Sequence, residues 1–169
     1  TGNSLFLGNS LPIREWNLCA QRAVPVEEVR ASRGANGIDG QLSAWLGSTN
    51  GHDKAWGVFG DLTTLYDLTA PAFLEQDEAK ERVLVVINNG GGRIFDRLPD
   101  FRELSRDEHD HVVNTHSQKF QSWASMWGLD YQLVTRRDHF DVKSQDRPLV
   151  LELQPNEKQT LEFWEGWDS

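Results

Sequence analysis

Two residues that follow apolar runs carry side chains suited to binding a divalent metal and a phosphate group. Asp61 comes just after the apolar segment 55–59 and a glycine, and Asn88 follows the run Val83-Leu-Val-Val-Ile87. Because neighbouring parallel strands end at one edge of a sheet, both side chains should lie close together there. With a backbone carbonyl turned inward at Gly90, they would offer Mg²⁺ three oxygens and leave room for water and phosphate oxygens.

Asp61 also has a simpler interpretation. Apolar residues recur at helical spacing over 62–73, and in this interpretation Asp61 only caps that helix, with 90–92 an ordinary loop. The same helix would aim backbone N–H groups and its positive end at a phosphate. Spacing alone leaves both interpretations open. Neither common phosphate motif is present, since no Gly-Lys-Ser/Thr follows the glycines and Gly34, Gly37 and Gly40 lack the dinucleotide-binding spacing.

The elements that must position these residues alternate between strands and helices. Strands are expected at residues 4–8, 29–32, 55–59, 82–88, 131–134 and 148–153. Helices are expected from Pro12, up to Leu46, over 62–73 with a break at Pro71, and over 117–127. This order predicts an α/β fold, a doubly wound, mostly parallel sheet with helices on both faces. The turns at 33–40, 60–62 and 88–92 should lie at its ligand-binding edge.

The charged stretch 102–111 is expected to be a loop. Its acidic and histidine residues at 107–111 are consecutive, which favours solvated side chains over a metal site. Trp123 and Trp127 have helical spacing and are expected in the core.

Length and charge limit the class of protein. The 169 residues suit one domain, and the net charge of −9 argues against nucleic acid or an anionic membrane as the main partner. No apolar run approaches the roughly 20 residues of a membrane span. The single cysteine, Cys19, excludes an internal disulfide, fits a reducing compartment and is expected to be buried. Because the chain opens on Thr1, we expect a fragment or a processed product.

Four short motifs carry a family resemblance. Gly60-Asp61 followed by Asn88-Asn89 is similar to the thiamine-diphosphate signature, Gly-Asp-Gly with a later Asn, although Leu62 replaces the third glycine. The other motifs are Gly-Asn-Ser-Leu-Pro-Ile-Arg at 8–14, Arg-Gly-Ala-Asn-Gly-Ile-Asp-Gly at 33–40, and the stretch 88–99. Together they resemble the MenD family, 2-succinyl-5-enolpyruvyl-6-hydroxy-3-cyclohexene-1-carboxylate synthase. The likeness is close over about the first 100 residues and loose beyond them.

The resemblance implies an activity and a domain organisation. The family decarboxylates 2-oxoglutarate on thiamine diphosphate and adds the succinyl unit to isochorismate. Residues 1–169 would form the diphosphate- and Mg²⁺-binding domain, without the pyrimidine-binding and central domains or the activating glutamate. The isolated chain should therefore be inactive. The whole enzyme should be a cytoplasmic homodimer or homotetramer, with the site completed by a neighbouring subunit's pyrimidine-binding domain.

The resemblance also assigns cofactor-binding residues. Asp61, Asn88 and the Gly90 carbonyl would hold Mg²⁺, while Ile38 would bend the cofactor so that its amino group can act as a base. The full set expected to bind cofactor is Asn9, Ser10, Gly37, Ile38, Gly60, Asp61, Leu62, Thr63, Asn88, Gly90 and Gly91.

Four further residues are expected to meet the substrates. Arg14 and Arg33 would bind carboxylates, which arginine recognises with two parallel donors. Ile94 and Phe95 would wall the site against water. Arg93 and His116 have no assigned role. The alternatives are another thiamine-diphosphate enzyme, of the acetolactate synthase or 2-oxo acid decarboxylase type, and a non-catalytic flavodoxin-like module that binds Mg²⁺ and nucleotide.

Overall fold

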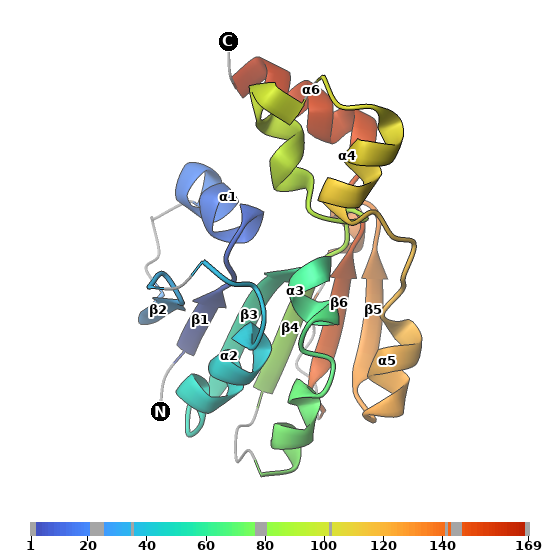
Figure 1. The fold of residues 1–169 in the computed structure, drawn as a ribbon. Helices are drawn as coiled ribbons and strands as arrows, with labels where there is room; N and C mark the ends of the chain where they lie inside the picture. Colours follow the sequence, from blue (N-terminus) through green and yellow to red (C-terminus); the bar gives the residue numbers. More distant parts are fainter. Residues whose placement is uncertain are drawn as a thin grey trace.

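The computed structural model contains one sheet of six parallel strands in the order β2-β1-β3-β4-β6-β5 (Figure 1). It describes residues 3–20, 26–34, 36–76, 81–101, 103–140, 142 and 147–167; Ala35, within the expected turn, and Arg102, within the expected loop, lie outside them. The strands are β1 (Asn3–Leu7), β2 (Glu28–Ala31), β3 (Lys54–Gly60), β4 (Glu81–Ile87), β5 (Asp130–Val134) and β6 (Leu149–Leu153). A parallel sheet with helices around it confirms the predicted α/β class.

Helices follow the strands along the chain. They are α1 (Leu11–Cys19), α2 (Gln41–Thr49), α3 (Asp61–Leu65), α4 (Arg106–Val113), α5 (Gln121–Met126) and α6 (Glu157–Trp167). Short 3₁₀ helices are η1 (Ala70–Gln76), η2 (Arg93–Arg97), η3 (Pro99–Phe101) and η4 (Arg137–His139). In Figure 1, α2 and α3 cover one face of the sheet, whereas α1, α4 and α6 lie toward the end to which the strand arrows point.

The core forms because the central strands are apolar on both sides. In β4, Val83 and Val86 are fully buried, and they belong to separate clusters on the two faces. The larger cluster joins β4 to α2 and α5 through Trp45, Phe59 and Trp123. Trp123 is buried as expected, while Trp127 is only half-buried and packs at the margin of this cluster.

The order of the strands reverses direction beside β1. Strand β1 lies between β2 and β3, so the chain leaves β1 toward one side and returns on the other. At such a reversal the loops beyond the strand ends diverge, which leaves space for ligands. The loops after β1, β2, β3 and β4, including the turns at 33–40, 60–62 and 88–92, all lie at this carboxyl end, as predicted.

The prediction of a loop at 102–111 is wrong, because α4 covers residues 106–113. Its start is a capping box: Ser105 Oγ accepts a hydrogen bond from Glu108 N, and the Glu108 carboxylate accepts from Ser105 N. These reciprocal bonds satisfy helix N–H groups that otherwise lack partners, so a highly charged segment can still be helical. Charge alone was a poor guide, and α6 was also missed.

One local expectation is wrong and a second needs adjustment. Cys19 ends α1 and is exposed, so it is not the buried side chain that we expected. The helix expected over 62–73 is divided, as predicted, but the division between α3 and η1 falls before Pro71, which lies inside η1; α3 keeps only five residues. Ser10 is the N-cap of α1, yet its side chain makes no capping hydrogen bond.

Candidate functional site

The Asp61 carboxylate lies at the meeting point of β3 and the loop after β4. Its Oδ2 accepts hydrogen bonds from Gly90 N at 2.8 Å and Gly91 N at 3.0 Å, and its Oδ1 accepts from Leu62 N at 2.6 Å. The side chain is 1% exposed, so these three N–H groups replace the water that a buried carboxylate loses. Asp61 is the first residue of α3, whose N-cap is Gly60, and its main contacts are with a loop that is distant in sequence.

The two glycines adopt backbone conformations that other residues avoid. Gly90 has φ 81° and Gly91 has φ 138°, which directs both N–H groups at Asp61. A Cβ atom on Gly91 would lie 2.7 Å from the Val113 carbonyl oxygen. The loop thus requires glycine at position 91 for space as well as for conformation.

The Asn88 side chain, directly after β4, is held by its amide nitrogen. Nδ2 donates to the Gln118 carbonyl at 2.9 Å and to Glu152 Oε1 at 2.7 Å. With both hydrogens directed at these acceptors, Oδ1 faces the other way and is the atom available to a metal. Asp61 and Asn88 directly follow adjacent strands, since β3 pairs with β4.

Glu152 is a fully buried carboxylate that the sequence analysis missed. Burial alone would raise the pKa of its carboxyl, but hydrogen bonds outweigh burial and bring the pKa below its usual range. The donors are Gln154 Nε2, Phe120 N, Asn88 Nδ2 and Tyr131 OH. A sequence signal did exist, namely one charged residue inside the apolar run Leu149-Val-Leu-Glu-Leu153.

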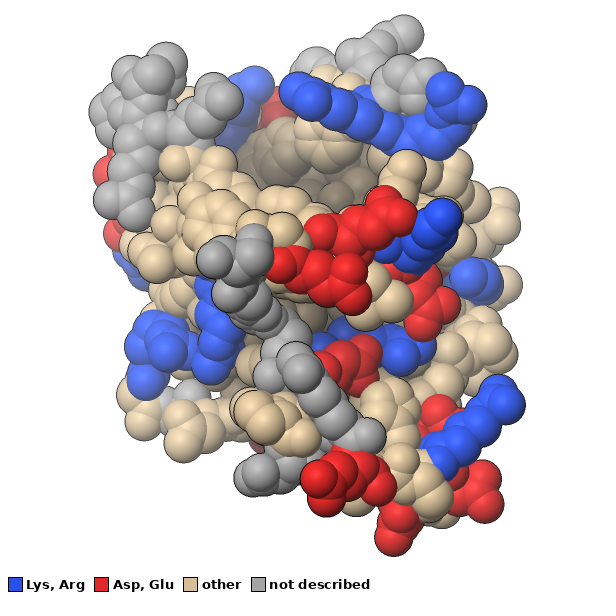
Figure 2. All heavy atoms as spheres, turned by 90° about the horizontal axis from the view of Figure 1, so that it is seen from above, with Lys and Arg blue, Asp and Glu red and all other residues tan. Residues whose placement is uncertain are grey.

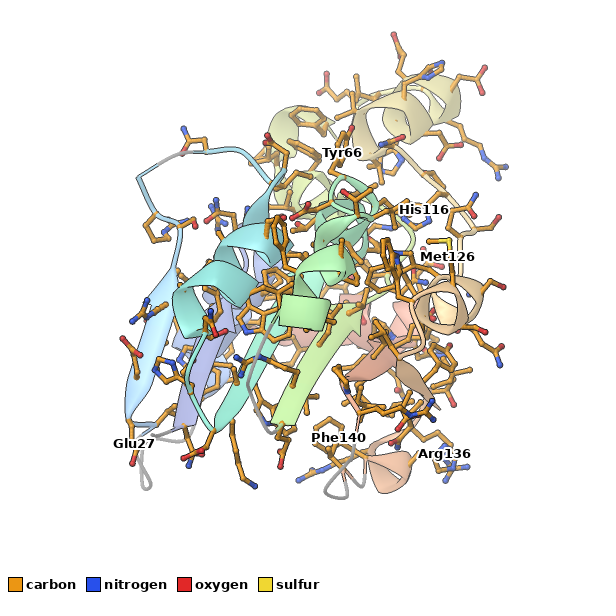
Figure 3. The ribbon with its side chains drawn as sticks, turned by 90° about the horizontal axis from the view of Figure 1, so that it is seen from below. Glu27, Tyr66, His116, Met126, Arg136 and Phe140 are labelled. Atoms are coloured by element: carbon orange, nitrogen blue, oxygen red, sulfur yellow. The ribbon has the colours of Figure 1, made fainter. Side chains whose placement is uncertain are left out.

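His116 approaches the same place from the segment that links α4 to α5; Figure 3 labels it. Its backbone N donates to the Gly90 carbonyl at 3.2 Å, and its ring Nδ1 accepts from Gln118 N. A neutral ring therefore carries its hydrogen on Nε2, which lies 3.3 Å from Asp61 Oδ2 but lacks the angle of a hydrogen bond. His116 thus places a polar nitrogen beside the carboxylate.

A second polar cluster joins the loops that follow β1 and β2. Asn9 N donates to Gln41 Oε1, while Asn9 Nδ2 and Gln41 Nε2 both donate to the Gly37 carbonyl, each at 2.8 Å. This arrangement positions the backbone before Ile38, which is half-buried. Gln41 was also missed, because a glutamine at the start of a helix resembles any surface residue in sequence.

The two arginines expected to meet substrate lie near this second cluster. Arg33 Nη1 is 3.4 Å from Asn9 Oδ1, and Arg14 Nη1 donates to the Ser10 carbonyl at 2.6 Å. Both side chains are exposed. Ser10 itself has φ 75°, an uncommon conformation for a residue with a Cβ atom. Figure 2 views the carboxyl end from above, where acidic and basic side chains occur in separate groups rather than as one basic surface.

The other expected residues surround these clusters. Thr63 is buried in α3, Leu62 is half-buried, and Gly60 is the N-cap of that helix. Ile94 and Phe95 are half-buried in η2, where the Phe95 ring lies 5.6 Å from that of Phe101.

Arg93 and the charged stretch in α4 make structural contacts. Arg93 Nε donates to the Asn89 carbonyl, and its Nη1 lies 3.5 Å from Asp96. His109 Nε2 lies 2.8 Å from the other oxygen of Asp96. Within the described residues, no group of three or more His, Cys, Asp or Glu side chains is arranged to hold a metal ion.

Comparison with known proteins identifies relatives over nearly the whole chain. The chain is 42% identical to 2-succinyl-5-enolpyruvyl-6-hydroxy-3-cyclohexene-1-carboxylate synthase of Bdellovibrio bacteriovorus, over 169 residues that cover 99% of the chain. The enzyme of the same name from Akkermansia muciniphila is 41% identical over 162 residues, 94% of the chain. The chain belongs to the MenD family. It spans about 30% of the length of each of these two relatives.

The MenD relationship agrees with the fold. Its extent is consistent with a MenD carboxyl-terminal domain, and the all-parallel sheet matches a thiamine-diphosphate-binding domain. A third MenD relative, from Shewanella frigidimarina, is 36% identical over 143 residues. No protein-family model matches the chain. Among the described residues, the helices are too short or too polar to cross a bilayer.

Proposed function

We propose that this chain is the Mg²⁺- and diphosphate-binding part of a thiamine-diphosphate-dependent MenD synthase. Asp61, Asn88 and the Gly90 carbonyl hold the metal. The observation that carries the proposal is the junction of Asp61 with the Gly90–Gly91 loop, beside the Asn88 amide. Asp61 and Asn88 directly follow two adjacent parallel strands, at the edge where α/β sheets bind ligands.

The oxygen atoms present fit a magnesium ion. A carboxylate has about four acceptor positions, and three of those on Asp61 are taken by N–H groups, so one remains. Asn88 contributes Oδ1 because its nitrogen is already engaged. The Gly90 carbonyl accepts one hydrogen bond, from His116 N, and retains a second lone pair. Three neutral or anionic oxygens, completed by phosphate and water, satisfy the preference of Mg²⁺.

The remaining residues of the proposed site bind and orient the cofactor and the substrates. Leu62 and Thr63 would contact the diphosphate, and Ile38 would support the cofactor, with the Asn9–Gly37 junction holding the backbone before it. Thiamine diphosphate, when bound, supplies the electron sink for decarboxylating 2-oxoglutarate before transfer to isochorismate. Arg14 and Arg33 bind the substrates' carboxylates through paired donors. Ile94 and Phe95 exclude water from the reacting groups.

The proposed site is completed by another part of the enzyme. A pyrimidine-binding domain from a neighbouring subunit, in a homodimer or homotetramer, provides the activating glutamate. The isolated chain is therefore inactive and binds cofactor weakly. The whole enzyme is proposed to be cytoplasmic. The supporting fact is that the chain spans only about 30% of each of the two MenD relatives in question.

Calorimetric titration of the purified protein tests the ligand class. Thiamine diphosphate should bind only when Mg²⁺ is present, and EDTA should abolish the heat, because the proposed oxygen ligands would hold the diphosphate through the metal. ATP is the comparison ligand. Preference for ATP, or thiamine diphosphate binding that ignores Mg²⁺, would contradict the proposal and favour a nucleotide-binding module.

A second experiment tests the substrates. A MenD protein of full length that carries this sequence should consume 2-oxoglutarate and isochorismate together, in equal amounts. The isolated chain should consume neither. Turnover by the chain alone would disprove the half-site proposal, whereas consumption of 2-oxoglutarate with a different acceptor would revise only the substrate.

A further inference from the structure

Glu152 occupies a position in the sheet where a carboxylate is costly. It is 0% exposed in β6, directly beside Val86 of β4, in the register that pairs Ile87 with Leu153. A charge without water needs several strong donors to remain stable. Four donors meet it, which shows that the local structure is organised around this carboxylate.

The two carboxylate oxygens have different neighbours. Oε1 accepts from Asn88 Nδ2 at 2.7 Å and from Gln154 Nε2 at 2.6 Å. Oε2 accepts from Phe120 N at 3.0 Å and from the Tyr131 hydroxyl at 2.8 Å. Only Oε1 therefore contacts Asn88, which directly follows β4 at the proposed metal site.

This contact determines which way the Asn88 amide faces. An ionised carboxylate only accepts hydrogen bonds, so Asn88 must present its NH₂ group to Glu152. The Gln118 carbonyl, also an acceptor, makes the same demand. If the amide turned over, Oδ1 would face two acceptors and an N–H group would face the cation position, which is unfavourable on both sides.

We propose that Glu152 is a positioning residue for the metal site, and that it holds the Asn88 amide with Oδ1 toward the metal. The inference rests on the proposed function. Glu152 does not touch the metal; it acts through Asn88, and the Phe120 N–H on its other oxygen also secures the segment that brings His116 to Asp61. Partners of this kind fix the orientation of metal ligands in many sites.

The test measures the affinity of the protein for Mn²⁺, which serves as a probe of the metal site. The EPR signal of the free ion gives the unbound concentration, in the presence of thiamine diphosphate. We expect Glu152→Gln to weaken Mn²⁺ binding roughly 10- to 100-fold, the range typical of residues behind a metal ligand. An amide at this position brings its own N–H group to Asn88, which favours the turned-over orientation.

The matched control is Tyr131→Phe. This change removes a donor from Oε2 and leaves the Oε1 contact with Asn88 in place. It should lower thermal stability, as Glu152→Gln does, but keep Mn²⁺ affinity. If the two variants lose metal affinity equally, Glu152 has only a structural role.

A rescue variant adds a readout that general stabilisation cannot produce. Asn88→Asp alone places two carboxylates in contact and should weaken Mn²⁺ binding. Combined with Glu152→Gln, the same aspartate can accept from the new amide and present its second oxygen to the metal. The double variant should therefore bind Mn²⁺ more tightly than either single variant; weaker or equal binding would contradict the inference.

The unaltered protein offers an independent measurement if Glu152→Gln does not fold. The Asn88 side-chain NH₂ protons should exchange slowly and shift when Mg²⁺ and thiamine diphosphate are added; rapid exchange or no shift would overturn the inference. Absence of Mn²⁺ binding by the unaltered protein would overturn the proposed function as well. Equal Mn²⁺ binding by the unaltered protein and Glu152→Gln would overturn only the role of Glu152.

Discussion

Asp61 Oδ2 accepts a 2.8 Å hydrogen bond from Gly90 N, although 29 positions separate the two residues in the chain. The bond joins the end of β3 to the loop after β4, and the Gly91 N–H reinforces it at 3.0 Å. A single carboxylate therefore shapes the loop that contains the Gly90 carbonyl of the proposed metal site. Stability and ligand binding should be coupled at this point.

Replacing Asp61 by Asn should reduce both the stability of the fold and the binding of ligand. One side-chain oxygen becomes an NH₂ group that faces backbone donors, so the free energy of unfolding should fall by about 1–3 kcal/mol. Magnesium-dependent binding of thiamine diphosphate should disappear. Urea denaturation measures the first effect and calorimetry the second.

Asp67→Asn is the matched control for this substitution. Asp67 is also buried, and it accepts from Ser43 N and Ser43 Oγ at the start of α2. Its replacement should lower stability by a similar amount and leave the ligand affinity unchanged. Loss of ligand binding in the control would mean that any damage to the fold abolishes the site.

Gly91→Ala should destabilise the protein strongly, since the new Cβ would meet the Val113 carbonyl at 2.7 Å and the backbone would be held at φ 138°. We expect a loss of about 1–3 kcal/mol in chemical denaturation. Gly47→Ala, in the exposed middle of α2 with open space around it, should instead gain about 0.5–1 kcal/mol. Equal effects at both positions would show that the loop is not strained.

Ser105→Ala should loosen the start of α4. The change removes the hydroxyl that accepts from Glu108 N and donates to the Glu108 carboxylate, whereas the backbone N–H of residue 105 can still donate to that carboxylate. The melting temperature should fall by about 2–4 °C. Hydrogen bonds from Ser105 hold the pKa of Glu108 below its usual range, so their contribution is present above the unfolded pKa and lost as pH falls through the folded pKa. Melting curves at neutral and acidic pH should therefore show the difference between variants shrinking in acid.

Tyr131 should resist ionisation. Burial first, and then the hydrogen bond to the Glu152 carboxylate with its negative charge, raise the pKa of the Tyr131 phenol above its ordinary value near 10. The folded state favours the protonated form, so this stabilisation is full below the unfolded pKa and is lost as pH rises through the folded pKa.

Absorbance at 295 nm after a rapid jump in pH measures this ionisation before the chain unfolds. The sequence has two tyrosines, and Tyr66 is 59% exposed (labelled in Figure 3). One tyrosine should ionise late, Tyr131→Phe should remove that late step, and Tyr66→Phe should retain it. Ionisation of both tyrosines together near pH 10 would contradict the buried Tyr131–Glu152 bond.

The strand ends and the polar residues that follow them were predictable from the amino-acid sequence. Apolar runs fix where buried strands lie, because only such residues can be surrounded by a sheet, and Asp61 and Asn88 were readable as the polar residues that follow them. The family followed from short motifs in a constant order. Charge was misleading in the stretch 102–111, where local capping outweighed the lack of an apolar pattern.

How those residues are held depends on the folded structure. That Glu152 faces Asn88, that His116 reaches Asp61 and that Gln41 supports the loop at Gly37 depend on contacts between segments far apart in the chain. A side chain's hydrogen-bond partners are set by packing of the whole sheet, which local spacing does not encode. The sequence thus determined which groups stand at the carboxyl end, and the fold decided which atom of each group faces the site.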